Sequence, residues 1–151
     1  MKPLTIILIL VMLTACTKRV PQEAHDALAS LRKIQASTEV GVNFQQYSSL
    51  LIEAKDKVNN ATRVLEDGPL KTEIMLAMDS YKDAGDVWQE KIKGEAQLTS
   101  VTDPGKTLIP KYSLKTTSEY HYQVCDTEKA LQTIWFLASL RLEKLSQLIP
   151  N

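Results

Sequence analysis

Apolar residues recur along much of this chain at alternating spacings of three and four residues, which is the period of an amphipathic helix. The first such segment runs from Pro21 to about Thr38, and Pro21 suits the first turn of a helix. Gly41 then fits a C-terminal stop, and Asn43 fits the N-cap of a second helix. The apolar positions of the first helix are Ala24, Ala27, Leu28, Leu31 and Ile34.

The second segment has the clearest pattern in the chain. Its apolar positions follow spacings of 3, 4, 3, 4, 3 and 4, with charged residues between them. This heptad pattern predicts an amphipathic helix with one face for packing. The pattern consists of Phe44, Tyr47, Leu51, Ala54, Val58, Ala61 and Leu65. Asp67-Gly68-Pro69 ends this helix and starts the next one.

The third segment continues the same period from Leu70 to Ile92, and Gly94 ends it. Gly85 lies inside this helix, where glycine costs about 1 kcal/mol relative to alanine, so we expect close approach of a neighbouring helix there. The last helix is expected from about Thr117 to Leu148. Its stretch 134–140 is apolar on nearly every side, which predicts a central helix or contact with a partner.

Residues 94–115 show no clear period and contain the turn sequence Asp103-Pro104-Gly105-Lys106. A connection of this length in a compact domain is usually functional or disordered. Its apolar stretch 108–114 predicts that this part packs on the helices. No strand pattern competes with these assignments. The predicted fold is therefore an all-α, antiparallel four-helix bundle over residues 21–151, with a long loop before the last helix.

The charges do not point to a nucleic-acid partner. The chain has 18 basic and 18 acidic residues, and the acidic residues alternate with lysines as on a solvated helix face. A basic face, which nucleic-acid binding needs, is not indicated. Beyond the N-terminus there is no second apolar run of membrane length.

The N-terminus has the features of a signal peptide, predicted to cover residues 1–15. Lys2 is followed by an apolar run from Leu4 to Leu13, which is too short for a transmembrane helix of roughly 20 residues. Small residues and a cysteine come next, and Leu13-Thr14-Ala15-Cys16 resembles the lipobox of bacterial lipoproteins. An ordinary secretory peptide with an accidental cysteine, or a short anchor helix, is the alternative.

The resemblance to bacterial lipoproteins implies a diacylglycerol on the thiol of Cys16 and cleavage just before it. Residues 16–20 then form the lipidated cysteine and a short polar tether. In that family an Asp after the cysteine favours retention in the inner membrane, and here the residue is Thr17. We therefore expect an outer-membrane protein that faces the periplasm.

Lipidation of Cys16 would leave Cys125 unpaired within the chain. Three interpretations of Cys125 stay open: a small buried hydrophobic residue, an intermolecular disulfide, or a reactive or metal-binding thiol. His121 precedes it by four residues, on the same face of the expected helix, but zinc needs three or four ligands and no others are evident. We expect no metal site and no cofactor.

No catalytic motif is evident, and the chain has only two histidines, His25 and His121. The expected function is a non-enzymatic interaction or structural module anchored by lipid. The alternatives are a binding module for a small apolar ligand or lipid in the bundle core, and an inhibitor or adaptor of another envelope protein. The candidate partner or ligand surface consists of Trp88, Tyr112, Tyr120, Trp135 and Phe136.

Part of the mature chain carries a second resemblance. The stretch Val40-Gly41-Val42-Asn43-Phe44-Gln45-Gln46-Tyr47, with Ala54-Lys55 and Val58, resembles small helical domains of bacterial envelope proteins of uncharacterised function. It covers about residues 28–93 and implies no activity.

Overall fold

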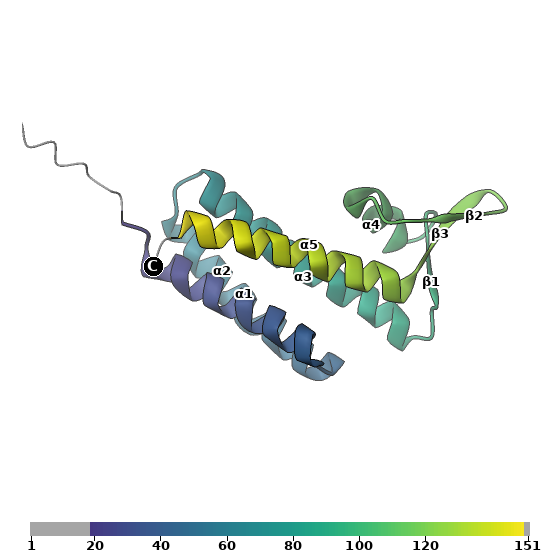
Figure 1. Ribbon diagram of the computed structural model, residues 1–151, viewed down its shortest axis with the longest axis horizontal. Coiled ribbons are helices and arrows are strands. Elements are labelled where there is room, and N and C mark those ends of the chain that lie inside the picture. Colours follow the sequence, from purple (N-terminus) through teal and green to yellow (C-terminus); the bar gives the residue numbers. More distant parts are fainter. Residues whose placement is uncertain (1–18, 150–151) are drawn as a thin grey trace, which may run out of the picture.

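Four long helices dominate the computed structural model, which describes residues 19–149. They are α1 (Gln22–Val40), α2 (Phe44–Val64), α3 (Pro69–Ile92) and α5 (Thr127–Leu148). Successive long helices run in opposite directions and pack lengthwise (Figure 1). Among residues 19–149, no helix has both the length and the apolar character needed to cross a bilayer. Cys16 and the expected signal peptide lie outside the described residues.

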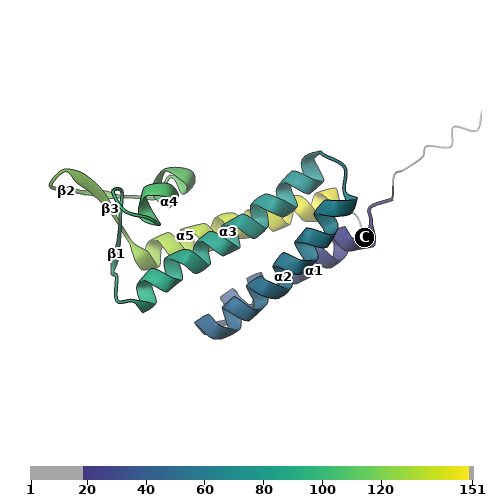
Figure 2. The ribbon, with the colours of Figure 1, turned by 180° about the vertical axis from the view of Figure 1, so that it is seen from behind.

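A small α/β unit, here called the cap, is inserted between α3 and α5. It comprises β1 (Gln97–Thr99), α4 (Gly105–Tyr112), β2 (Thr117–Glu119) and β3 (Tyr122–Asp126). The three strands form an antiparallel sheet in the order β1-β3-β2. Figures 1 and 2 show the cap at one end of the bundle and both ends of the described chain at the other.

The prediction of a mainly helical chain is confirmed, whereas the prediction of an all-α bundle holds only in part. Residues 94–115 contain β1 and α4 rather than an uninterrupted loop, and residues 117–126 form a β-hairpin rather than the start of the last helix. The two strands of the hairpin contain Thr117, Tyr122 and Val124, residue types that favour strands over helices. The helix begins only at Thr127, because the side chain of Asp126 accepts a hydrogen bond from the Lys129 amide at 2.9 Å.

The predicted ends of the first three helices are confirmed by local geometry. Gly41 follows α1 with a φ of 97°, which favours glycine. Asn43 caps α2 in a capping box with Gln46. Pro69 occupies the first turn of α3. Backbone amides in that turn have no hydrogen-bond partner within the helix, so the lack of an amide hydrogen on proline costs nothing there.

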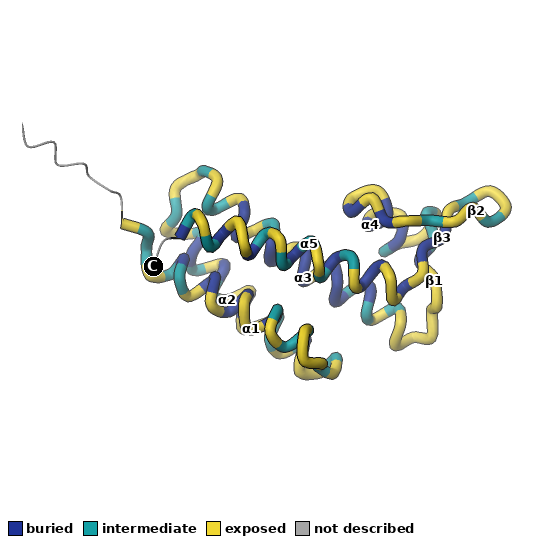
Figure 3. Tube along the Cα trace, viewed as in Figure 1, coloured by how far each residue is buried: buried dark blue, intermediate teal, exposed yellow. Residues whose placement is uncertain are grey.

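The core lies along the line where the four long helices meet. Contacts are most extensive between α3 and α5 and between α1 and α2. Figure 3 shows the buried turns of α3 facing the other helices, while α5 keeps an exposed side. On α5, Ile134 and Ala138 are fully buried, but Phe136 is 60% exposed. The apolar stretch 134–140 is therefore not buried on all sides.

Tyr47 of α2 joins three helices through its hydroxyl group. The hydroxyl donates a hydrogen bond to the backbone carbonyl of Tyr81 on α3 at 2.6 Å. It accepts one from the indole Nε1 of Trp135 on α5 at 3.2 Å. The Tyr47 side chain is fully buried, and desolvation raises the pKa of its hydroxyl, which therefore stays protonated.

Gly85 makes room for this contact, as its position inside α3 predicted. A Cβ at Gly85 would lie 3.1 Å from Cδ1 of Leu51 and 3.5 Å from Cε1 of Tyr47. Because Gly85 has no side chain, α2 can approach α3 closely. The Tyr47 hydroxyl can then reach the carbonyl of Tyr81, which lies one turn before Gly85 on α3.

We predict that Tyr47→Phe lowers the free energy of unfolding by about 1–3 kcal/mol, because it leaves the buried Tyr81 carbonyl and Trp135 indole without this partner. Tyr81→Phe is the matched control, since the buried Tyr81 hydroxyl has no hydrogen-bond partner among residues 19–149. It should leave stability unchanged or raise it. Urea unfolding followed by circular dichroism measures both, and equal losses in the two variants would contradict the assigned role of Tyr47.

The cap depends on a close contact between α4 and β1. A Cβ on Gly105 would lie 2.3 Å from the backbone oxygen of Thr99. This is a steric clash, and backbone atoms would have to move to remove it. We predict that Gly105→Ala destabilises the protein by about 1–3 kcal/mol. The exposed neighbour variant Lys106→Ala should change stability little. An unchanged unfolding curve for Gly105→Ala would show that this contact is not tight.

Candidate functional site

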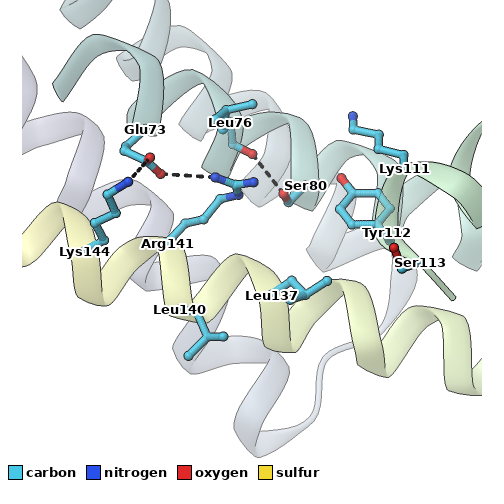
Figure 4. A pocket seen from close by; sticks show the side chains of 10 residues that line it. All are labelled: Glu73, Leu76, Ser80, Lys111, Tyr112, Ser113, Leu137, Leu140, Arg141 and Lys144. Atoms are coloured by element: carbon cyan, nitrogen blue, oxygen red, sulfur yellow. Dashed lines mark hydrogen bonds and ion pairs between the residues drawn. The ribbon is translucent and has the colours of Figure 1, made fainter. Parts of the chain in front are cut away.

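An open groove runs between α3 and α5 and ends against the C-terminal part of α4 (Figure 4). We call it the α3–α5 groove, and its volume is about 570 Å³. This volume is within the range of ligand sites, but the groove is partly open to solvent rather than an enclosed cavity. The residues that line it are Glu73, Leu76, Ser80, Lys111, Tyr112, Ser113, Leu137, Leu140, Arg141 and Lys144.

Glu73 is the carboxylate to which two cationic side chains bond at one end of the groove. It is only 7% exposed, and its carboxylate accepts from Nζ of Lys144 at 2.5 Å and from Nη1 of Arg141 at 3.1 Å. The hydrogen bond from Lys144 is the largest cause that lowers the pKa of Glu73 below its ordinary value of 4.5, and Arg141 adds to it. The carboxylate therefore holds both cations beside the groove.

A second buried carboxylate fixes the other end of the groove. Asp83 of α3 accepts hydrogen bonds from the Tyr112 hydroxyl at 2.7 Å and from Nζ of Lys111 at 2.6 Å. Burial raises the pKa of Tyr112, so its hydroxyl remains a donor. These bonds attach α4 to α3 and hold the Tyr112 ring as a wall of the groove.

The hydroxyl groups of Ser80 and Tyr112 in the lining are already hydrogen-bonded within the protein. Ser80 donates its hydroxyl hydrogen to the carbonyl of Leu76 at 2.9 Å, and no histidine is among the lining residues. What the groove presents is cationic side chains beside leucine side chains and an aromatic ring.

The five residues of the expected partner surface are divided among four places. Trp88 and Trp135 contact each other edge to face, with ring centroids 5.4 Å apart, and both contact Tyr47. Phe44 adds a further edge contact to Trp88 at 5.7 Å. These four rings form an aromatic cluster between α2, α3 and α5.

The other three residues of that expected surface lie elsewhere. Tyr112 lines the α3–α5 groove, and Phe136 lies on the exposed side of α5, one turn before Leu140 of the groove. Tyr120 is 92% exposed in the two-residue turn of the β2–β3 hairpin, where its φ is 51°. Trp135 and Leu137 are two residues apart on α5 and so point to opposite sides, which separates the aromatic cluster from the groove.

Cys125 is buried on β3, opposite Leu98 of β1. Burial is the main cause that raises the pKa of its thiol, so the reactive thiolate form is disfavoured. The expected helical alignment of His121 with Cys125 is wrong, because His121 is exposed in the hairpin turn. Among residues 19–149, no three His, Cys, Asp or Glu side chains are grouped to hold a metal ion.

The ionic part of the groove was missed by reasoning from the sequence. Glu73 lies four residues before Ala77, on the apolar side of α3, and an acidic residue at such a position indicates a buried carboxylate with a partner. The position of Glu73 could therefore have indicated a buried carboxylate from the sequence alone. Its partners could not be identified in this way, because Arg141 and Lys144 lie about 70 positions later in the chain.

Comparison with known proteins finds no matching family model, no matching curated protein and no matching solved structure.

We predict that Glu73→Gln lowers the free energy of unfolding at neutral pH by about 1 kcal/mol or more, because it removes the acceptor shared by two cations. Because folding lowers the pKa of Glu73, its contribution is complete above the ordinary value of 4.5 and is lost as the pH falls through the folded-state pKa. The variant should therefore lose this part of the acid dependence.

Glu53→Gln is the matched control for Glu73→Gln, since Glu53 pairs with Lys33 at 2.8 Å but both side chains are about half exposed. It should change stability by less than about 1 kcal/mol. Urea unfolding at neutral and acidic pH measures both variants. The same acid dependence in Glu73→Gln and the wild type would refute the account of Glu73.

Proposed function

We propose that this protein is a lipid-anchored, non-enzymatic envelope protein whose helical domain acts as an interaction or structural module. The observation that carries the proposal is the lipobox-like sequence Leu13-Thr14-Ala15-Cys16, which begins at the last residue of a short apolar run. On this proposal residues 1–15 are removed, Cys16 carries lipid, and residues 16–20 form the tether. Thr17 after the cysteine favours an outer membrane, with the domain in the periplasm.

The arrangement of the chain is compatible with such an anchor. The described chain begins just before α1, at the end of the bundle opposite the cap (Figure 1). The 24 residues of α3 span about 36 Å at 1.5 Å per residue. A bundle that stands on its tether would therefore hold the cap well away from the bilayer and leave the sides of the helices open to partners.

The packing of the aromatic residues favours an interaction module over a ligand site in the bundle core. Trp88, Trp135 and Tyr47 contact one another with centroid distances of 5.3–5.9 Å, as rings do in a packed core. The charged and apolar surface lies instead in the open α3–α5 groove, where a protein partner can reach it.

We predict that the full chain, expressed in a bacterial host with an alkyne-tagged fatty acid, becomes labelled and fractionates with membranes. Cys16→Ser should lose both the label and the membrane association, because the thiol is the acylation site. Cys125→Ser is the matched control and should keep both. Membrane association of Cys16→Ser at the wild-type level, or an unlabelled wild type, would overturn the lipid anchor.

A further inference from the structure

We propose that the α3–α5 groove, together with Phe136, binds an extended segment of a partner protein that carries acidic side chains next to large apolar ones. This inference rests on the proposed function as an interaction module and names the surface and the chemistry of the partner.

The charges of the groove call for an acidic occupant. Three cationic residues line it, namely Lys111, Arg141 and Lys144, against one acidic residue, Glu73. Asp83 lies behind Lys111 and pairs with it, while Glu73 pairs with both Arg141 and Lys144. Three cations thus share two carboxylates, which leaves this set with one net positive charge. A carboxylate placed in the groove would compensate it.

Arg141 has the geometry to receive such a carboxylate. Its Nη1 bonds to Glu73, which holds the guanidinium in place at the groove. A guanidinium has five N–H donors in a planar fork, so donors remain for a bidentate bond to a second carboxylate. Its side chain is 35% exposed, which leaves the group accessible while limiting its movement.

The apolar part of the surface is continuous with the charged part. Leu76, Leu137 and the Tyr112 ring line the groove, and Leu140 lies at its edge with 42% exposure. Phe136 lies one helical turn before Leu140 on the same side of α5 and is 60% exposed. Single exposed apolar residues are ordinary, but adjacent ones beside an arginine and a tyrosine have the composition of interface hot spots.

The position of the charges favours a peptide over a lipid. Figure 4 shows Lys144 at one end of the groove, Lys111 at the other and Arg141 between them, with leucines along the same path. A single-chain lipid has its charge at one end only, whereas acidic and apolar side chains alternate along a peptide. The stretch of α3 from Glu73 to Ser80 is about 10 Å long, enough for three or four residues of extended chain.

A phage library of random linear 12-residue peptides tests the proposal on the full chain, purified in non-ionic detergent as the host produces it. We expect enriched peptides to carry Asp or Glu next to Leu, Phe or Trp. The best peptide, synthesised with a fluorophore, should bind Phe136→Ala and Arg141→Gln about tenfold more weakly in fluorescence anisotropy. Such a loss corresponds to about 1.4 kcal/mol. Phe136→Ala changes only an exposed side chain, so it keeps the test valid if Arg141→Gln folds poorly.

Ile52→Ala is the matched control, because Ile52 is 72% exposed on α2, away from the groove, and it should leave the affinity unchanged. No enrichment, enrichment of basic peptides, or equal loss in Ile52→Ala would overturn the proposal.

Phosphatidylglycerol vesicles that bind the wild type but not Phe136→Ala would instead assign the surface to a membrane. A dimer in sedimentation that Phe136→Ala dissociates would assign it to a second copy. Peptide binding is measured in detergent and does not require a membrane. The result therefore tests the groove separately from the lipid anchor on Cys16.

Discussion

The hydrogen bonds of the Tyr47 hydroxyl join the two helix pairs of the bundle through a single buried group. The α1–α2 pair and the α3–α5 pair each have extensive contacts within the pair. Tyr47 connects the two pairs, because its hydroxyl bonds to α3 and to α5 at the same time. Two further features make this possible: a glycine at position 85, which lets α2 approach, and the Trp135 indole, which points at the hydroxyl. A buried polar contact between several elements also specifies how they are aligned, which apolar packing alone does less well.

A second set of polar contacts attaches the cap to this frame and forms the groove. Asp83 of α3 holds α4 through Tyr112 and Lys111, and Glu73 holds Arg141 and Lys144 of α5. Both carboxylates lie on α3 and are buried, so removal of a partner would leave an uncompensated charge. The groove is thus a fixed surface between three helices, and its charges are already oriented before any partner arrives. Such pre-organisation lowers the entropy lost on binding.

The long helices could be predicted from the sequence because their signals are local. Spacings of three and four residues, Asn43 as a cap, Gly41 as a stop and Pro69 as a start each depend on a few neighbours in the chain. The cap could not be predicted in the same way, because its strands have three to five residues and are stabilised by pairing, such as Leu98 with Cys125. The groove depends on pairs about 70 residues apart, which the helical period does not encode. The lipid anchor on Cys16 stays a prediction.

We propose a protein held at a membrane by its N-terminus, with a preformed surface for acidic peptides on the side of the bundle. Photo-crosslinking in the native envelope tests this claim most directly, with a benzophenone amino acid at position 136 or, as a control, at position 52. We expect crosslinks from position 136 alone, to a protein segment in which sequencing finds acidic residues beside large apolar ones. Crosslinks of equal yield from both positions, or a segment without acidic residues, would contradict it.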